Sequence, residues 1–198
     1  MTVPRVSSDP LAPCGVRTTG LAVNSVLDYA LKTYGPTVVA ELGASLPAVM
    51  GEPIARRQVP TSAWVPVEMY FGCVQYLVKR FHGGDVLAAR AIGKATAEQD
   101  IGAFFKTVLA FSSPKMIISL SGRFWTNYYD RGAHHIITHE DHRVVGDLTD
   151  WPLTDELVAN EIAGSFLAYL EHSRAANVRV ETLEAPAPRT LRFSFVWD

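Results

Sequence analysis

The densest group of metal-binding residue types lies around a turn expected at Glu140-Asp141, where four of the six histidines fall within nine positions. His139, Asp141 and His142 combine imidazole and carboxylate groups, which first-row transition metals accept as ligands. In a strand, however, His135 and His139 point to one face and His134 to the other. They therefore do not converge as ligands four residues apart on a helix do. A solvated polar hairpin is the favoured interpretation, and a metal site at His139, Asp141 and His142 is the weaker alternative.

Cys73 is the residue most suited to nucleophilic chemistry, and it lies in an apolar helical stretch. A cysteine in such a place is more often a small core residue than a nucleophile or an acylation site, although the sequence leaves both open. The sequence contains no Gly-x-Ser-x-Gly elbow, no Gly-x-Gly-x-x-Gly loop, no Walker-type loop and no His-Glu-x-x-His motif. No catalytic residue is therefore predicted.

The most unusual segment in composition runs from position 121 to 131, where four aromatic side chains lie between two arginines. One interpretation is packing at the edge of the core with polar tips at the surface. The other is a mostly apolar pocket with a few polar anchors. On the second interpretation the predicted ligand-binding residues are Arg123, Trp125, Asn127 and Tyr128, together with Phe71 and Phe193 from other elements.

The first 125 residues have mainly helical periodicity. Asn24 is expected to cap a first helix that ends at Gly35-Pro36, and residues 51–60 are expected to form a turn-rich connection. Ser62 is expected to cap a long apolar helix that ends at His82, and this helix is expected to be buried on most sides. Further helices are expected near 85–97 and 100–111.

The remaining residues have mixed periodicity. Residues 134–139 and 142–148 alternate as a hairpin, a helix starts near Thr154, and residues 178–183 and 191–197 alternate as two more strands. One face of the last strand is strongly aromatic. This order predicts an α+β domain in which the helical N-terminal half packs on a four-stranded antiparallel sheet.

Length and composition limit the class of protein. The 198 residues suffice for one domain with a buried core, expected over 16–198 after a flexible segment at 1–15. Apolar residues make up 48%, mean hydropathy is +0.10, and net charge is -2. No stretch is long and apolar enough for a membrane span, and nothing in the charge favours nucleic acid. Without a signal-like N-terminus, we expect a cytoplasmic protein.

Several segments resemble a set of paralogous myxobacterial proteins of unknown function. The resemblance covers most of the chain and rests on Arg123-Phe-x-x-Asn127-Tyr128, on Asn177-Val-Arg-Val-Glu181 and on the terminal Phe195-Val-Trp197. That family is similar to a superfamily of haem nitric-oxide-binding domains, vinyl-reductase-type ligand-sensing domains and Bet3-like subunits of vesicle tethering complexes. The resemblance implies helices over a four-stranded antiparallel sheet, an apolar cavity between them, and a homodimer. It implies no catalytic residues.

The chain departs from the haem branch of that superfamily. That branch carries a Tyr-x-Ser-x-Arg motif about thirty residues after a ligating histidine, whereas here Tyr129-Asp-Arg131 breaks the motif and no histidine lies between His82 and His134. The clustered cysteines of the vinyl-reductase-type branch are also missing. These departures argue against haem, and no cofactor is predicted.

Three functional hypotheses follow, in order of preference. The first is a non-enzymatic sensory or regulatory domain that binds a small apolar molecule or a lipid between the helices and the sheet. The second is a protein–protein interaction module whose apolar surplus forms an interface without a ligand cavity. The third is a metal-dependent enzyme built on His139, Asp141 and His142.

Overall fold

The computed structural model describes residues 13–198, except for the side chains of residues 103–105. The helices are α1 (Gly20–Tyr34), α2 (Thr37–Ala44), α3 (Ala48–Ala55), α4 (Glu68–Phe81), α5 (Ala88–Asp100), α6 (Ala103–Ala110), α7 (Pro114–Trp125) and α8 (Glu156–Glu171). The strands are β1 (Arg17–Thr19), β2 (Trp64–Pro66), β3 (Ala133–His139), β4 (Arg143–Thr149), β5 (Arg179–Leu183) and β6 (Leu191–Val196). None of the described helices is long and apolar enough to cross a membrane.

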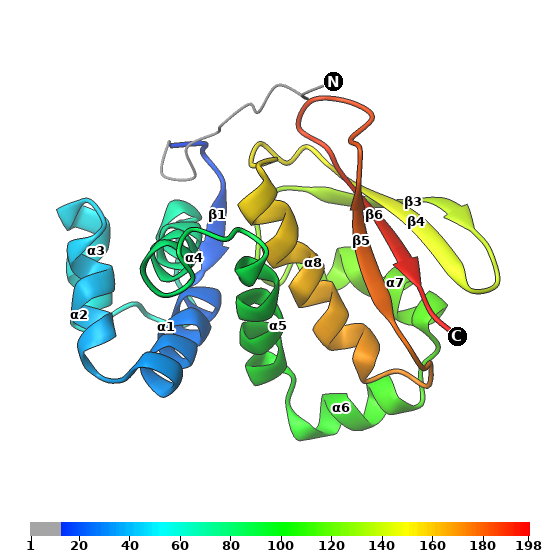
Figure 1. The fold of residues 1–198 in the computed structure, drawn as a ribbon, viewed down its shortest axis with the longest axis horizontal. Coiled ribbons are helices and arrows are strands. Elements are labelled where there is room, and N and C mark those ends of the chain that lie inside the picture. Colours follow the sequence, from blue (N-terminus) through cyan, green and yellow to red (C-terminus); the bar gives the residue numbers. More distant parts are fainter. Residues whose placement is uncertain (1–12) are drawn as a thin grey trace.

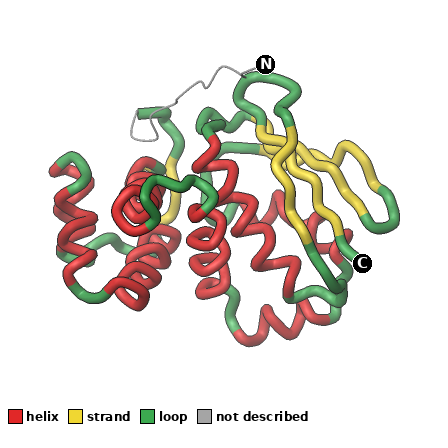
Figure 2. The backbone as a smooth tube through the Cα atoms, in the orientation of Figure 1, coloured by secondary structure: helices red, strands yellow, loops and turns green. Residues whose placement is uncertain are grey.

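The predicted α+β architecture is confirmed. Strands β3 to β6 form an antiparallel sheet in the order β3-β4-β6-β5, and β1 pairs with β2 in a separate two-stranded sheet. Figure 1 shows the larger sheet at one end of the molecule, α2 and α3 at the opposite end, and α5 and α8 between them. The tube in Figure 2 shows the same separation of helices from strands. The α5–α8 layer therefore joins the helical half to the sheet.

The aromatic face of the last strand is covered by α8. Val144 pairs with Phe195 and Gly146 with Phe193, so both phenylalanines lie on the inner face of the sheet. The Phe166 ring of α8 lies 5.5 Å from the Phe193 ring and 5.2 Å from the Phe195 ring, centroid to centroid, in edge-to-face contacts. Phe193 and Phe195 are only 1% and 3% exposed, and their burial against Phe166 holds α8 against the sheet.

Helices α5 and α8 approach each other closely because each has a glycine at the contact. A Cβ at Gly93 would lie 2.1 Å from the Glu161 carbonyl oxygen, and one at Gly164 would lie 2.0 Å from the Arg90 carbonyl oxygen. No larger side chain fits at either position without separating the helices. This approach places the middle of α8 directly beside α5.

Local sequence sets the starts of α7 and α8. The Ser113 hydroxyl accepts a hydrogen bond from the Met116 amide at 3.2 Å, with Pro114 as the first helical residue. The Asp155 carboxylate accepts one from the Val158 amide at 3.0 Å. Two helices that line the interior are thus fixed at their N-termini by side-chain caps.

Three predicted boundaries in the first half are wrong. The first helix begins at Gly20, and Asn24 lies inside it, where its amide donates to the Val59 carbonyl at 3.0 Å. Ser62 does not cap the apolar helix, because residues 64–66 pair with β1 and α4 starts only at Glu68. Part of the expected turn-rich connection is helix α3, which includes Pro53. The expected burial of the apolar helix is confirmed over most of α4.

The predicted β3–β4 hairpin is present, but the expected facing of its histidines is wrong. Partners shift between Ile136 and Thr138, so the strand contains a β-bulge. Before the bulge His135 pairs with Asp147 on the outer face, and after it His139 pairs with Val144 on the inner face. The extra residue therefore places His135 and His139 on opposite faces.

The expected flexible segment at 1–15 lies largely outside the described residues, and its flexibility stays a prediction. The assignment of 16–198 to one domain likewise stays a prediction.

Candidate functional site

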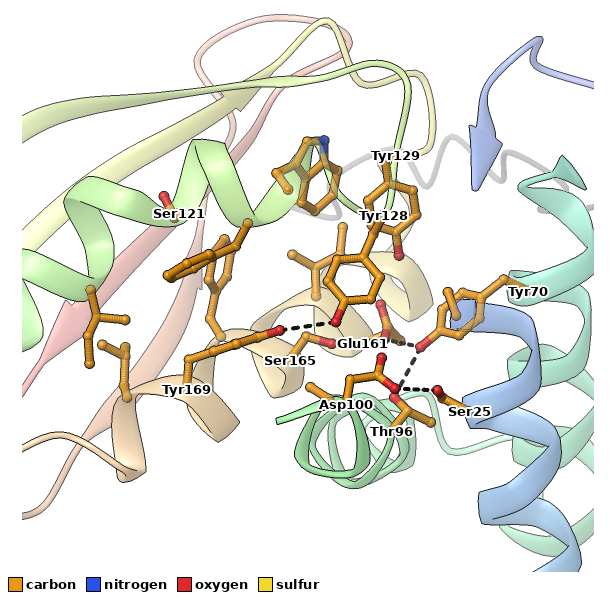
Figure 3. A pocket seen from close by; sticks show the side chains of 18 of the residues that line it. Ser25, Tyr70, Thr96, Asp100, Ser121, Tyr128, Tyr129, Glu161, Ser165 and Tyr169 are labelled. Atoms are coloured by element: carbon orange, nitrogen blue, oxygen red, sulfur yellow. Dashed lines mark hydrogen bonds between the residues drawn. The ribbon is translucent and has the colours of Figure 1, made fainter. Parts of the chain in front are cut away.

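A cavity of about 80 Å³ lies among α1, α4, α5, α7 and α8. Its lining combines aromatic rings with buried polar groups, as Figure 3 shows. The lining residues are Ala22, Ser25, Tyr70, Thr96, Ala97, Asp100, Ile117, Ile118, Ser121, Phe124, Trp125, Tyr128, Tyr129, Glu161, Ile162, Ser165, Phe166, Tyr169 and Leu170. The volume suits a few water molecules or one small molecule.

Glu161 of α8 is the most deeply buried charged group of the cavity, at 1% exposure. Its Oε1 accepts hydrogen bonds from the Tyr70 hydroxyl at 2.6 Å and from the Ser165 hydroxyl at 3.1 Å. Its Oε2 is buried and has no hydrogen-bond partner among the described residues. A buried carboxyl oxygen without a donor is costly, so this atom marks a place where a donor group would be stabilised.

Burial also changes the acidity of Glu161. Desolvation raises the pKa of this carboxyl from 4.5 to about 7, although hydrogen bonds from Tyr70 and Ser165 partly offset the rise. Its protonation state therefore changes near neutral pH. A ligand that favours one state would shift this equilibrium.

Asp100, the last residue of α5, contributes a second carboxyl. The Ser25 hydroxyl donates to its Oδ1 at 2.5 Å. Desolvation raises the pKa of Asp100, while hydrogen bonds from Ser25 and Tyr128 lower it in part. Figure 3 shows Asp100 and Glu161 near the same end of the cavity, with Ser25, Thr96 and Tyr70 around them.

The rest of the wall is aromatic and is fixed by its own contacts. Trp125 Nε1 donates to the Arg131 carbonyl at 2.6 Å, and the Trp125 ring lies 4.3 Å from that of Tyr129 and 4.9 Å from that of Trp151, centroid to centroid. The Tyr128 and Tyr169 hydroxyl oxygens are 3.4 Å apart. The aromatic rings of segment 121–131 therefore do both things that the sequence suggested: they pack on the core, and they line a cavity.

The structure does not bring the six predicted ligand-binding residues together. Trp125 and Tyr128 line the cavity, whereas Arg123 and Asn127 are exposed. Phe71 is buried beside Trp151, 6.4 Å between ring centroids. Phe193 lies on the inner face of the sheet and lines a separate space of about 10 Å³.

Sequence reasoning missed the acidic end of the cavity. Glu161 stands three residues after Val158 and one before Ile162, and both of these apolar residues are buried in α8. A carboxylate inside an apolar stripe is a usable signal, since ionisable residues are rarely buried without a partner or a role. Asp100 and Tyr70 offer no comparable signal, because only the tertiary packing of α4, α5 and α8 brings them together.

The metal alternative is wrong for this structure. His139, Asp141 and His142 are exposed, and Asp141 pairs with Lys115 at 3.3 Å. In the part of the chain that the structure describes, no group of three or more His, Cys, Asp or Glu residues could hold a metal ion. The turn residues of the hairpin are exposed and polar, as in the favoured interpretation, although Ile136 and Ile137 of β3 are exposed as well.

His134 differs from the other three histidines of the hairpin because it is half-buried, with its Nε2 atom fully buried. It lies 5.0 Å from the Trp125 ring and 5.2 Å from the Phe166 ring, centroid to centroid, directly behind the cavity wall. Its Nδ1 is 3.3 Å from the Ser121 hydroxyl, and its Nε2 has no partner among the described residues. Desolvation lowers the pKa of His134 to about 4, so the ring is neutral at physiological pH.

Cys73 is fully buried on α4, and desolvation raises the pKa of its thiol to about 12. Such a thiol is protonated and inaccessible, which suits a core residue. Neither Cys73 nor Cys14 is in a disulfide.

Comparison with solved structures identifies the fold. An H-NOX protein from K. algicida in the unliganded Fe(II) state has a TM-score of 0.67 and 9% identity over 91% of this chain and 96% of its own. A triple mutant of an S. oneidensis H-NOX protein has a TM-score of 0.69 and 14% identity over the same shares. An oxygen-binding H-NOX domain related to soluble guanylate cyclases, in its oxygen complex, has a TM-score of 0.64 and 10% identity over 91% and 95%.

These likenesses confirm the predicted resemblance to haem nitric-oxide-binding domains at the level of the fold. No protein-family model matches the chain, and no curated protein matches it significantly. The myxobacterial, vinyl-reductase-type and Bet3-like parts of the predicted relationship stay predictions.

The expectation that argued against haem is wrong. Structures with this fold include Fe(II) H-NOX proteins and one described through its haem redox potential and porphyrin distortion. The missing Tyr-x-Ser-x-Arg motif is a difference in sequence only. This chain has the fold of an H-NOX domain with which it shares about 10% identity, although it lacks the motif. Haem is therefore a cofactor to be tested for this fold.

His134 is the candidate iron ligand of this chain, but its ring lies behind Trp125 and Phe166 and does not line the cavity. The cavity lining contains tyrosines but, among the described residues, no His, Cys or Met. Tyrosine and histidine both serve as haem ligands. His134 offers a buried, unpartnered Nε2, and the Ser121 contact at Nδ1 would fix the ring orientation. A porphyrin is much larger than the cavity, so the aromatic wall would have to open to admit one.

Proposed function

We propose that this chain is a non-enzymatic sensory domain that holds its ligand in the cavity among α1, α4, α5, α7 and α8. The observation that carries the proposal is the unpartnered Oε2 of Glu161, buried in a cavity with aromatic walls. Such a combination of apolar walls and a few converging polar groups is typical of small-molecule sites.

The path from ligand to response would run along α8. Glu161 lies at the cavity, and Phe166, five residues later, packs on the sheet through Phe193 and Phe195. A ligand that moves Glu161 would therefore shift the ring that holds the helix to the sheet. Packed interfaces of this kind move between discrete arrangements, which suits a switch.

Haem is the first ligand to test because solved proteins of this fold carry it. When bound, it would supply an iron centre able to take a diatomic gas. In this chain His134 would be the residue to hold the iron, and the Trp125 and Phe166 rings, which separate it from the cavity, would have to move to admit the group. A small molecule that fits the cavity without rearrangement is the other possibility.

One purification tests the proposal. Untagged protein is analysed by native and denaturing mass spectrometry and by visible absorption, before and after reconstitution with haemin. We expect a mass excess that is lost on denaturation, or a Soret band on reconstitution. His134→Ala should abolish a histidine-ligated spectrum, whereas the matched control His135→Ala, on the exposed face of β3, should keep it. Protein that carries no mass excess and binds neither haemin nor small molecules would overturn the proposal.

The predicted homodimer is a separate proposal. Exposed apolar side chains at Phe111, Met116 and Ile137 would suit a contact between copies. Size-exclusion chromatography with light scattering tests it. A monomer at micromolar concentration would reject the dimer without affecting the ligand site.

A further inference from the structure

The charge of the cavity wall is unbalanced. Glu161 and Asp100 both line it, and no Lys, Arg or His occurs among its described lining residues. Neither carboxyl forms an ion pair with a described residue, and both accept hydrogen bonds from neutral hydroxyls, those of Tyr70, Ser165 and Ser25 among them. Two carboxyls in one partly buried space therefore lack a cationic partner within the described part of the protein.

The hydrogen-bond pattern of Glu161 leaves a defined position for a donor. Oε1 already accepts from Tyr70 and Ser165, whereas Oε2 accepts from no described residue. The residue is buried at 1% exposure, so water is largely excluded from this atom. An N–H group of a ligand in the cavity would donate to Oε2, and a charged N–H group would form the strongest hydrogen bond there.

Aromatic rings supply the remaining wall. Tyr70, Trp125, Tyr128 and Tyr129 all line the same space as the two carboxyls. The faces of such rings attract cations, most strongly when the cation is desolvated. Aromatic rings together with a carboxylate form the usual recognition site for an organic ammonium group, and the volume of about 80 Å³ limits the ligand to a small one.

We propose that this cavity binds a small organic ammonium ion, whose N–H groups pair with Glu161 and Asp100 between aromatic rings. The inference rests on the proposed function, because it names the ligand class of the same cavity. A neutral donor would satisfy Oε2 but would leave the two carboxyls without a counter-charge. An anion would be repelled by both.

The test compares three probes of similar shape and different charge. Isothermal titration calorimetry at pH 7.5 measures binding of n-butylammonium, n-butanol and butyrate to the full chain. We expect n-butylammonium to bind at least tenfold more tightly than n-butanol, and butyrate not to bind. Glu161→Gln should weaken n-butylammonium at least tenfold, whereas Glu156→Gln, which removes an exposed carboxyl from the same helix, should not. Circular dichroism checks that both variants are folded.

The outcomes separate the ligand class from the proposed function. Equal binding of n-butylammonium and n-butanol would reject the ammonium inference and would still support a ligand site in the cavity. Unchanged n-butylammonium binding in Glu161→Gln would reject it too, because the ion would then lie elsewhere. No binding by any probe, together with a Soret band on reconstitution, would reject the ammonium ion but keep a sensory domain. No binding of any kind would reject both.

Discussion

The Tyr70 hydroxyl of α4 and the Glu161 carboxyl of α8 are joined by a 2.6 Å hydrogen bond inside the protein. The two residues are 91 positions apart in sequence, and both are at most 3% exposed. Thr96 of α5 lies 3.2 Å from the same hydroxyl. This contact therefore ties three helices together at the acidic end of the cavity.

Removal of the Tyr70 hydroxyl should destabilise the fold. Tyr70→Phe keeps the ring but leaves Glu161 Oε1 with only Ser165 as a donor, and a lost partner of a buried acid costs about 2 kcal/mol. Urea denaturation followed by circular dichroism measures the change in the free energy of unfolding. The matched control is Tyr76→Phe, whose 2.6 Å bond to Glu41 is only partly buried, with an expected cost below about 1 kcal/mol. Equal costs for the two variants would contradict the assigned importance of the buried bond.

The pH dependence of stability should change when Glu161 is replaced. The folded protein holds this proton up to a pKa of about 7, whereas the unfolded chain releases it near 4.5. Between these values the folded state binds more protons, so Glu161 makes the protein less stable as pH rises. At about 1.4 kcal/mol per pH unit, the loss reaches about 3 kcal/mol by pH 7.

Glu161→Gln cannot lose this proton, so its stability relative to wild type should increase from pH 4.5 to 7 and then level off. Urea denaturation across that range measures the difference. His134 must be present in both proteins, because its lowered pKa of about 4 has the opposite effect below pH 6.5 and cancels only in the comparison. A difference independent of pH would show that Glu161 titrates normally.

The α+β fold could be predicted from the sequence because the patterns that indicate its strands and helices are local. The alternation of residues 191–197 and the caps of the helix near Thr154 each depend on neighbours in the chain, and the sheet and α8 follow from them. The boundary at Asn24 failed because tertiary pairing of β1 with β2 moves the start of α1 to Gly20. The facing of His139 was predicted wrongly for a related reason. The bulge after Ile136 adds one residue to the strand and so reverses the facing of all later side chains.

The site was harder to predict than the fold. Trp125 and Tyr128 stood out by composition, but a segment that is rich in aromatic residues does not reveal which rings face inward. Arg123 and Asn127 were expected as polar anchors because they are next to those rings, yet the polar groups of the cavity come mainly from α1, α4, α5 and α8. A site assembled from separate helices has no spacing rule in the sequence. Only Glu161, a charged residue among the buried apolar residues of α8, could have indicated this site from the sequence.

Filling the contact between α5 and α8 should destabilise the protein and disturb the cavity. Gly93→Ala places a methyl group 2.1 Å from the Glu161 carbonyl oxygen, which cannot move without shifting α8. Overpacking against backbone costs about 3 kcal/mol. Thermal unfolding measures the loss, and increased acrylamide quenching of the buried tryptophans, Trp125 and Trp151 among them, reports opening of the wall. Gly122→Ala, inside α7, is the control, since a Cβ there would meet only the His134 Cβ at 3.9 Å and alanine is the better helix former, so stability should not fall.

Cys73 should be unreactive in the folded protein, which would exclude acylation there. With a pKa of about 12, about one thiol in ten thousand is ionised at pH 8, and the side chain is inaccessible. In Cys14→Ser, Cys73 is the remaining thiol, so its reaction with a disulfide reagent can be followed by absorbance. We expect no reaction without denaturant and complete reaction in 6 M guanidinium, on the order of the concentration that unfolds most domains. Fast labelling of native Cys14→Ser, or a fatty acyl mass on Cys73 of purified protein, would contradict a buried thiol and return the acylation hypothesis. Absence of labelling in both conditions would instead reveal a thiol that is already modified, which intact mass measurement detects directly.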